Sequence, residues 1–373
     1  MNVPLVIPYV DHREEEIVLD VLRSGWFAHG PRNKEFEADW AKKFGVKHAI
    51  SMNSCASTLH VAIQASGITG EVILPSFTFV ASANAIITAG ASPVFADIDP
   101  KTGNIDPKSI ESLITDKTEA IMPVHWAGQV ADMTAIMAIA QKYSLKVIED
   151  SAETIGGTHH GKLGGTWGIG CYSFYPGKNM TTAEGGMFTT DDDVVAEKAR
   201  IIMGHGISKT TLDRHEGKAQ PWIRSAVMSG YNFRMSNLHA AIGVVQLSKL
   251  DEMNSKRQAN SEYYFQGLKD VEGVQLPYIE EGNQHVWQMF TIQVSKDKRD
   301  DLVNYLRDQG IGASVHFDPP VHLMKPYMNV KGADNLPVTN EVYKRLMTLP
   351  MFPHLTREQM DFVIEHIKKF MNV

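Results

Sequence analysis

Short apolar runs alternate with segments of helical period along residues 1–250, and this alternation restricts the possible folds more than any other feature. A strand and then a helix, repeated about every twenty to thirty residues, gives parallel strands with helices on both faces. We expect a large α/β domain with an N-terminal helical segment and a mostly parallel, seven-stranded sheet. The predicted strands are Lys47–Ser51, Glu71–Leu74, Pro93–Asp97, Ala120–Val124, Leu145–Glu149, Gly170–Phe174 and Gly186–Thr190.

The pattern changes after a predicted helix at Asn237–Leu250, where long polar helices replace the regular alternation. We expect a smaller α+β domain over residues 251–373, joined to residues 1–250 at or inside a long connecting helix. A chain of 373 residues is large enough for two cores. The predicted elements of the second domain are a strand at Gln288–Val294, a helix at Lys298–Gln309 and closing helices around Asn340–Leu346 and Arg357–Lys369.

The overall charge argues against two classes of partner. A formal net charge of -7 and a pI near 6.1 provide no broad attraction for nucleic acid or for an anionic membrane. No run reaches about 18 apolar residues and the N-terminus has few basic residues, so we expect a cytoplasmic protein. The two cysteines, Cys55 and Cys171, are too few for a disulfide framework and fit a reducing compartment.

Lys178 carries most of the functional information in the sequence. It follows an apolar strand and stands after Pro176 and Gly177, in a turn that continues neither helix nor strand. A desolvated amine loses its proton more readily than a free lysine at ~10.4, and the neutral amine forms Schiff bases with aldehydes such as pyridoxal phosphate. Most loop lysines are solvated surface charges, so this interpretation depends on other segments.

Residues that directly follow the other strands have the greatest weight, because ligands bind beyond the carboxyl ends of such strands. Residues 53–58 open a helix whose free amides suit a phosphate, although N-capping by Ser54 or Ser57 explains the segment equally well. Phe77 and Phe79 follow the next strand. An aromatic ring in this position either stacks on a flat heterocycle or packs in the core. Each of these signals is weak alone.

Asp150 and Glu153 follow the strand Leu145–Glu149 and allow two interpretations. A carboxylate at this strand end would hold the proton of a pyridinium ring and make the ring a stronger electron sink. The same spacing fits a capping box with Asp150 in the Ser/Thr position, and we give the two interpretations equal weight. Ser173, which precedes Lys178 in its segment, adds a hydroxyl for a phosphate. Together these strand ends supply the groups that pyridoxal phosphate needs.

Characteristic segments also stand in order along nearly the whole chain. They are Ser24-Gly25-Trp26, Phe44-Gly45-Val46, Pro75-Ser76-Phe77-Thr78-Phe79, Pro123-Val124-His125, Ile148-Glu149-Asp150-Ser151-Ala152-Glu153, the Lys178 segment and Gly230-Tyr231-Asn232-Phe233-Arg234-Met235. This series resembles the DegT/DnrJ/EryC1/StrS group of fold-type-I pyridoxal phosphate aminotransferases, which aminate keto-sugars. The resemblance implies an aspartate-aminotransferase-like fold with a large sheet domain and a smaller α+β domain.

The resemblance assigns roles to the residues around the cofactor ring. It implies that Lys178 carries pyridoxal phosphate in a covalent link and that Asp150 faces the pyridine nitrogen. Phe79 matches the residue that stacks on the ring. Glu153 occupies a position near the ring hydroxyl that often carries Gln, which is a modest departure from the family pattern.

The resemblance also implies how the cofactor phosphate is held. The amides around Ala56 and Ser57 and the hydroxyl of Ser173 bind it. Many relatives have Gly-Thr where this chain has Cys55-Ala56, but backbone amides do not need those side chains. Asn232 matches an asparagine that reaches the phosphate from the other subunit, so the resemblance implies a homodimer with two composite sites.

The expected reaction follows from the retained lysine. Some relatives carry histidine at this position and remove a hydroxyl, whereas Lys178 can carry a proton between cofactor and substrate and so favours amination. The resemblance implies that L-glutamate donates the amine and that a keto-sugar accepts it with ping-pong kinetics. A nucleotide-linked 4-keto-6-deoxy hexose for cell-surface polysaccharide or lipopolysaccharide is the leading acceptor. The alternative is a long-chain keto-sugar acid of the 3-deoxy-octulosonate type.

The residues expected to line the substrate entrance come from separate parts of the sequence. They are Trp26, His29, the polar loop His205–Arg224, His316 and His322. Within the loop, Lys209, Arg214, Lys218 and Arg224 either pair with a diphosphate or carboxylate or remain solvated.

The sequence bears differently on two other function classes and on a metal site. A nicotinamide-linked oxidoreductase is disfavoured because Met52–Thr58 contains no glycine and so lacks the G-x-G-x-x-G fingerprint. A non-catalytic protein that binds the cofactor as a regulator stays open, although the set Lys178, Asp150 and Asn232 argues against it. His159 and His160 lie between glycines and predict a hairpin tip rather than a metal site, so no metal is expected.

Overall fold

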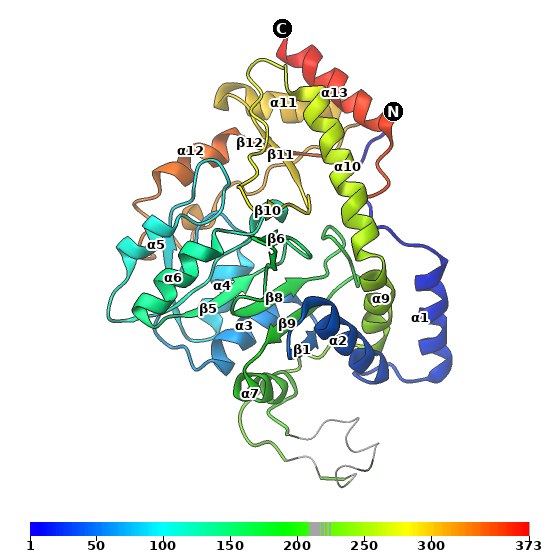
Figure 1. Cartoon of the computed structure of the whole chain (residues 1–373), viewed down its shortest axis with the longest axis vertical. Coiled ribbons are helices and arrows are strands. Elements are labelled where there is room, and N and C mark those ends of the chain that lie inside the picture. Colours follow the sequence, from blue (N-terminus) through cyan, green and yellow to red (C-terminus); the bar gives the residue numbers. More distant parts are fainter. Residues whose placement is uncertain (209–216, 218–219, 221, 224, 373) are drawn as a thin grey trace.

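A computed structural model describes residues 1–208, 217, 220, 222–223 and 225–372, and the expected α/β fold is confirmed (Figure 1). Seven strands form one sheet in the order β1-β9-β8-β5-β4-β2-β3, in which β9 is antiparallel to both of its neighbours and the other neighbouring pairs are parallel. The strands are β1 (His48–Met52), β2 (Glu71–Pro75), β3 (Ser92–Ala96), β4 (Thr118–Ile121), β5 (Lys146–Asp150), β8 (Ile169–Ser173) and β9 (Gly186–Thr190).

Each predicted strand overlaps an observed one, and β4 is displaced most. It ends at Ile121, whereas the prediction extended to Val124. Pro123 has no N–H to donate to a neighbouring strand, so the ladder is interrupted there and resumes as a single bridge between Val124 and Asp150.

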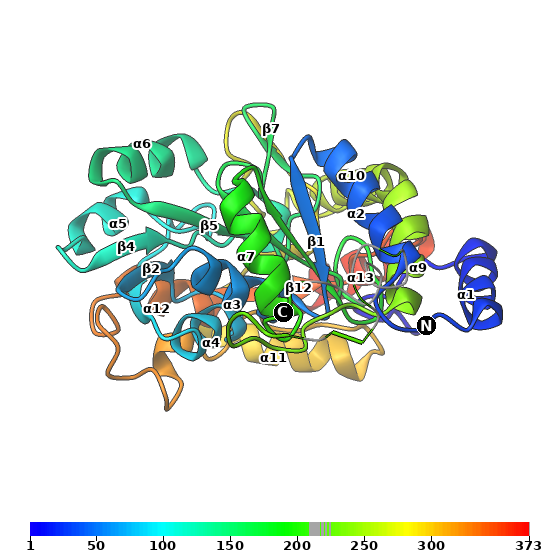
Figure 2. The same cartoon turned by 90° about the horizontal axis from the view of Figure 1, so that it is seen from below.

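Helices cover both faces of the sheet because successive strand side chains point to opposite sides. In β2, Val72 and Leu74 pack with α3, α4 and α7, whereas Ile73 packs with α5 and α6 on the other face. Figure 2 places α1 at the outer edge of the molecule, away from the sheet. The helices are α1 (His12–Ser24), α2 (Pro31–Phe44), α3 (Cys55–Ala65), α4 (Ala81–Thr88), α5 (Pro107–Leu113), α6 (Met133–Tyr143), α7 (Asp193–Met203), α9 (Asn237–Ser248) and α10 (Leu250–Leu268), with a short 3-10 turn η1 (Trp126–Gly128).

The C-terminal part forms the expected smaller α+β unit. Its elements are the antiparallel pair β11 (Phe290–Gln293) and β12 (Leu346–Leu349), with α11 (Lys296–Asp308), η2 (Val321–Leu323), α12 (Pro337–Arg345) and α13 (Arg357–Met371). Figure 1 shows α10 running from α9 toward α13. The start of α10 packs beside α2 and α9, and its end packs in the C-terminal core, which also includes Val3. The boundary between residues 250 and 251 stays a prediction.

A small sheet connects the two parts of the chain. β10 (Asn283–Gln284) pairs with β6 (Thr158–His159), and β6 pairs with β7 (Lys162–Leu163). His160 and Gly161 have positive φ and turn the chain between β6 and β7, as the hairpin prediction requires. None of the described helices combines the length and apolar character that a membrane crossing needs.

A buried aspartate ties α12 to the large sheet and gives a test of the fold. Asp97, which follows β3, accepts hydrogen bonds from Val338 N at 2.9 Å, Thr339 N at 2.8 Å and Thr339 Oγ1 at 2.7 Å. We expect Asp97→Ala to lower the free energy of unfolding in urea by about 2–4 kcal/mol, because buried donors lose their acceptor. The matched control is Asp106→Ala, which removes the N-cap of α5 and should cost about 1 kcal/mol. Equal losses in the two variants would contradict a special role for Asp97.

Candidate active site

A cavity of about 600 Å³ lies at the carboxyl ends of β1, β2, β5 and β8, where the sequence predicts a ligand site. Its volume is within the range of about 300–1,000 Å³ that is usual for small-molecule sites. The C-terminal part closes it with residues after α11 and in β12. Seven of the predicted site residues line this cavity, namely Ala56, Phe79, Asp150, Glu153, Ser173, Lys178 and His316.

Asp150 is held at the end of β5 by two hydrogen bonds. Ser82 donates its hydroxyl to Oδ2 at 2.7 Å, and the Ala152 amide donates to Oδ1 at 3.1 Å. Burial raises the pKa of Asp150, and these two hydrogen bonds oppose that shift. No helix follows Asp150, since the next residues form a turn. The capping-box interpretation is therefore wrong, and the carboxyl group is directed to the cavity.

Glu153 and Lys178 form an ion pair inside the cavity. Lys178 Nζ lies 3.3 Å from Glu153 Oε1, and Glu153 Oε2 accepts the Ala127 amide at 3.0 Å. Glu153 is buried and the lysine side chain is nearly so. A charged pair in such a place is strongly oriented, since each partner would otherwise be left without compensation for its lost hydration. The amine is thus held in the cavity that Asp150 also lines.

The turn that carries Lys178 is fixed from the C-terminal part of the chain. Gln288 Nε2 donates to the Gly177 carbonyl at 2.8 Å, and Arg257 Nη2 donates to the Lys178 carbonyl at 3.3 Å. Asn179 Nδ2 donates to the Val286 carbonyl at 3.0 Å. The first two contacts satisfy backbone acceptors of the turn, and the third ties the Asn179 side chain to the C-terminal part, so the backbone that carries the lysine is held in place.

The first turn of α3 faces the cavity with Ser54, Cys55 and Ala56. Ser54 is the N-cap, and its Oγ accepts the Ser57 amide at 3.1 Å, so the capping alternative for this segment is also correct. The earlier amides of the turn have no acceptor within the helix and suit an anion. Gly186 permits this arrangement, because a Cβ there would lie 2.6 Å from the Ser54 carbonyl carbon. Ser57 itself does not line the cavity.

Phe79 and His316 also line the cavity. Phe79 is 61% exposed in the single chain, and its ring centroid is 6.2 Å from that of Phe317. His316 is hydrogen-bonded through Nδ1 to Thr348 Oγ1 at 2.8 Å. Burial lowers the pKa of His316, so the imidazole is neutral at pH 7 and offers Nε2 as a polar contact.

Other predicted residues lie away from this cavity. The prediction that His322 lines the substrate entrance is wrong. Its ring is buried between Ser76 and Asn340 and anchors the C-terminal part to the end of β2. Trp26 and His29 contact each other before α2 and do not line the cavity of their own chain. Asn232 is on the surface and also does not line it. Four predicted loop residues are outside the described residues, namely Lys209, Arg214, Lys218 and Arg224.

Sequence reasoning missed several residues that line the cavity or fix its walls. Ser82 has a signal that was available, because it lies in the first turn of α4, the helix that follows β2, and that turn reaches the same edge of the sheet as Asp150. Leu5, Val6 and Gln288 have no such signal, since each comes from a distant part of the chain.

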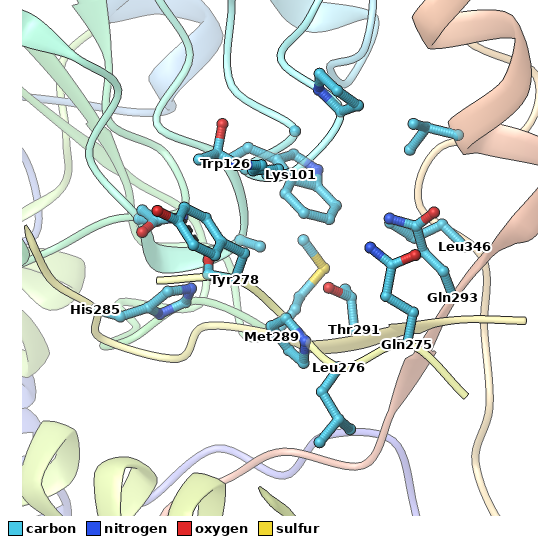
Figure 3. A pocket seen from close by; sticks show the side chains of 17 residues that line it. Lys101, Trp126, Gln275, Leu276, Tyr278, His285, Met289, Thr291, Gln293 and Leu346 are labelled. Carbon is cyan, nitrogen blue, oxygen red and sulfur yellow. Dashed lines mark hydrogen bonds between the residues drawn. The ribbon is translucent and has the colours of Figure 1, made fainter. Parts of the chain in front are cut away.

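A second hollow lies between η1 and the residues before β11 (Figure 3). Trp126, Tyr278 and His285 contribute to its walls, and the indole N–H of Trp126 is buried without a protein acceptor. Its volume is about 30 Å³, which is enough for a water molecule or two and too small for a cofactor. The large cavity is therefore the candidate active site.

Metal binding receives no support from the described residues, among which no group of three or more His, Cys, Asp or Glu side chains is arranged to hold an ion. His159 is instead hydrogen-bonded to Thr134 at 2.9 Å and to Asn283 at 2.7 Å. These bonds give the histidine a role in joining β6 to its neighbours.

Known proteins resemble this chain over its whole length. The model of the DegT/DnrJ/EryC1/StrS aminotransferase family matches residues 8–368. The spore coat polysaccharide biosynthesis protein SpsC of Bacillus subtilis is 38% identical over 375 residues, which cover 98% of this chain and 96% of SpsC. DesV of S. venezuelae, solved in complex with a ketimine intermediate, is 31% identical with a TM-score of 0.90, covering 100% of this chain and 99% of DesV. Spr1654 of Streptococcus pneumoniae, named as a sugar aminotransferase, has a TM-score of 0.93 in its PMP form at 26% identity, covering 100% and 99%, and was also solved in a PLP form.

The burial of Asp150 predicts a pH-dependent effect on stability. A raised acid pKa means that the folded protein keeps a proton that the unfolded chain has lost, so this carboxyl weakens the fold as the pH rises. We expect the cofactor-free Asp150→Asn variant to melt at a higher temperature than wild type at pH 8. The difference should shrink as the pH falls toward 3.8, the ordinary pKa of aspartate.

Asp193→Asn is the control, for which we expect the opposite change in melting temperature. Hydrogen bonds from Lys47 and His48 lower the pKa of this exposed carboxyl, so it stabilises the fold above its unfolded pKa. The Asp193→Asn variant should therefore have a slightly lower melting temperature than wild type at pH 8. If Asp150→Asn also melts below wild type at pH 8, the proposed cost of burying Asp150 is wrong.

Proposed function

Because this chain belongs to the DegT/DnrJ/EryC1/StrS aminotransferase family, we propose that it moves an amino group from L-glutamate to a keto-sugar. It is a pyridoxal phosphate-dependent sugar aminotransferase, and pyridoxamine phosphate is the second form of its cofactor. The proposal concerns the donor, the acceptor and the roles of individual residues. The observation that carries it is the single cavity that holds Lys178, Asp150 and the first turn of α3.

The residues of the cavity fit pyridoxal phosphate. Its aldehyde needs an amine, its ring nitrogen needs an acid and its phosphate needs unpaired amides, and Lys178, Asp150 and Ala56 offer these in one cavity. Ser173 adds a hydroxyl near the phosphate end, and Phe79 offers a ring face. When bound, the cofactor supplies an electron sink for removal of the substrate α-proton.

The protein's own contribution is to hold and move protons. Asp150 is oriented by Ser82 and Ala152 so that a carboxylate oxygen is available to a ring N–H. Glu153 holds the Lys178 amine, and it would be the residue that meets the ring hydroxyl of a bound cofactor. Lys178 Nζ would hold the cofactor aldehyde and, once released from it, would be the base that accepts the substrate α-proton and the acid that gives a proton back.

For the acceptor we propose a nucleotide-linked 4-keto-6-deoxy hexose in polysaccharide synthesis, since SpsC takes part in spore coat polysaccharide biosynthesis. A long-chain keto-sugar acid of lipopolysaccharide is the second candidate. A cytoplasmic location and lipopolysaccharide as the pathway are further parts of the proposal. A panel of keto-sugars offered to the pyridoxamine form of the enzyme would identify the acceptor.

Replacement of the lysine tests the central role. We expect Lys178→Ala to lose covalent attachment of the cofactor, measured by mass spectrometry after borohydride reduction, and to lose turnover by about 10²- to 10⁴-fold or more. Lys142→Ala is the matched control, because Lys142 pairs with Glu111 on the surface. Full turnover by Lys178→Ala would contradict its role.

The absorption spectrum separates an enzyme from a non-catalytic regulator. Addition of L-glutamate to the yellow holoprotein should bleach the visible band as the cofactor is converted to its amine form. A regulator would bind the cofactor and keep its spectrum after glutamate is added. The same experiment with L-aspartate and L-glutamine tests the choice of donor.

A composite site in a homodimer is tested by mixing subunits. We propose that Asn232 of one subunit binds the phosphate held by Lys178 of the other. Mixed and refolded Lys178→Ala and Asn232→Ala chains should then recover about a quarter of wild-type activity, because half of the dimers are mixed and each contains one intact site. No recovery above the two separate variants would show that Asn232 does not act across the interface.

A further inference from the structure

The small hollow beside η1 (Figure 3) adjoins a larger groove along α12. The groove has a volume of about 390 Å³, and five residues line both spaces, namely Pro100, Lys101, Gln275, Gln293 and Val342. The two spaces lie where the loop after β3 meets the C-terminal part of the chain, and small-molecule sites often occur at such junctions. Together they form one space of the size that holds a small ligand.

Met289 and η1 separate this space from the active-site cavity. Among the described residues, Met289 alone lines both the hollow and the cavity. Ala127 in η1 lines the hollow, and its amide donates to Glu153, which lines the cavity. The hollow and groove are therefore a distinct space with their own set of polar groups.

The hollow presents hydrogen-bond donors that have no acceptor. Trp126 is 6% exposed, and its indole N–H is buried without an acceptor among the described residues. His285 Nδ1 accepts the Trp287 amide at 2.9 Å, and burial lowers the pKa of His285 to about 3, so the neutral ring carries its hydrogen on Nε2. No described residue accepts that hydrogen, and the described residues that line the hollow include no Asp or Glu. A ligand that fits here brings the acceptors.

Two cations line the groove. Lys101 Nζ lies 5.4 Å from the centroid of the Tyr278 ring, and Arg345 Nη2 donates to Gln275 Oε1 at 3.5 Å. Neither cation forms an ion pair with a carboxylate of the described residues. Glu341 is the one acidic side chain among the described residues of the groove, so two cations and one carboxylate leave a net positive charge. A ligand with a single negative charge would balance it.

The remaining walls favour a ligand that combines a carboxylate with a hydrocarbon body. The inner hollow, at about 30 Å³, has room for two oxygen atoms, since it would hold a water molecule or two. Pro337, Val338 and Val342 line the outer groove along α12 and would cover an apolar body.

We propose that the hollow and groove bind a small organic acid, with its carboxylate beside Trp126 and His285 and its hydrocarbon body along α12. The indole and imidazole N–H groups donate to the carboxylate oxygens, which are stronger acceptors than a neutral carbonyl oxygen. Lys101 adds charge attraction where the hollow meets the groove. The site depends neither on the amino donor nor on the keto-sugar of the proposed function.

Calorimetry with the holoenzyme tests this site. The probe is 4-methylpentanoate, and the matched neutral ligand is 4-methylpentanamide, which has the same shape. Wild type should bind the acid about 10- to 100-fold more tightly than the amide, because hydrogen bonds to a charged acceptor are stronger. A higher salt concentration should weaken the binding of the acid and leave that of the amide unchanged.

Replacement of Trp126 locates the carboxylate. Trp126→Phe keeps an aromatic ring and removes the N–H, so the affinity for the acid should fall by about 10-fold. Trp167→Phe is the matched control and should keep the wild-type affinity. The indole N–H of Trp167 is also buried without an acceptor among the described residues, but Trp167 lines neither the hollow nor the groove.

Replacement of Lys101 tests the charge. Lys101→Met should lower the affinity for the acid by about 2- to 5-fold, as expected for an exposed cation. Lys344→Met is the control, because Lys344 is next to Arg345 in α12 but does not line the groove. Thermal unfolding of each variant shows whether it is folded. If Trp126→Phe does not fold, the comparison of Lys101→Met with Lys344→Met decides alone.

Three results would overturn the site. They are no saturable binding of the acid by wild type, equal affinities for the acid and the amide, and wild-type affinity in the folded Trp126 and Lys101 variants. The third result would place the acid elsewhere, such as in the active-site cavity. Amine transfer from glutamate is measured separately, so a failure of the proposed function and a failure of this site are told apart.

Discussion

The buried carboxylate of Glu149, one residue before Asp150, is the interaction on which the geometry of the site depends. Its Oε2 accepts His125 Nε2 at 2.9 Å and the Gly165 amide at 2.7 Å, and its Oε1 accepts the amides of Trp167 and Gly168. Since His125 Nδ1 accepts the Ala131 amide, Nε2 carries the hydrogen that is donated to Glu149. A charge with no exposed surface is tolerated because every lone pair has a donor.

This interaction joins the loops that enter and leave the centre of the sheet. The hydrogen bond from the Trp167 amide to Glu149 holds the residues before β8 next to β5. The hydrogen bond from His125 to Glu149 fixes the residues after β4. Side chains at successive strand positions point to opposite faces, so a locked Glu149 leaves Asp150 directed to the cavity. Lys178 is fixed separately, by Gln288 and Arg257, and both parts of the chain must be folded before the amine and the acid face one site.

Much of the fold could be predicted, because the seven strands are encoded by local apolar runs. The strand ends also indicated Lys178 and Asp150, since ligands of parallel sheets lie at that edge. The capping-box prediction failed because the same residue spacing also occurs in turns, and the backbone after Asp150 forms a turn. The prediction that His322 lines the substrate entrance failed for a different reason. A histidine near a predicted site looks the same in sequence whether it faces the ligand or, as here, bonds Ser76 and Asn340 inside the core.

The amino-acid sequence by itself determined the fold class and indicated a pyridoxal phosphate site, because periodicity and the residues after each strand are local properties, and its resemblance to a family implied the reaction. Tertiary structure decided which distant residues meet there. Val6 and Gly177 are neighbours because β11, β12 and the N-terminal segment pack as one unit against the Lys178 turn. No local pattern records such a contact, since it is the summed burial of many side chains that brings the segments together. The lysine therefore indicates the reaction, and packing decides which distant residues surround it.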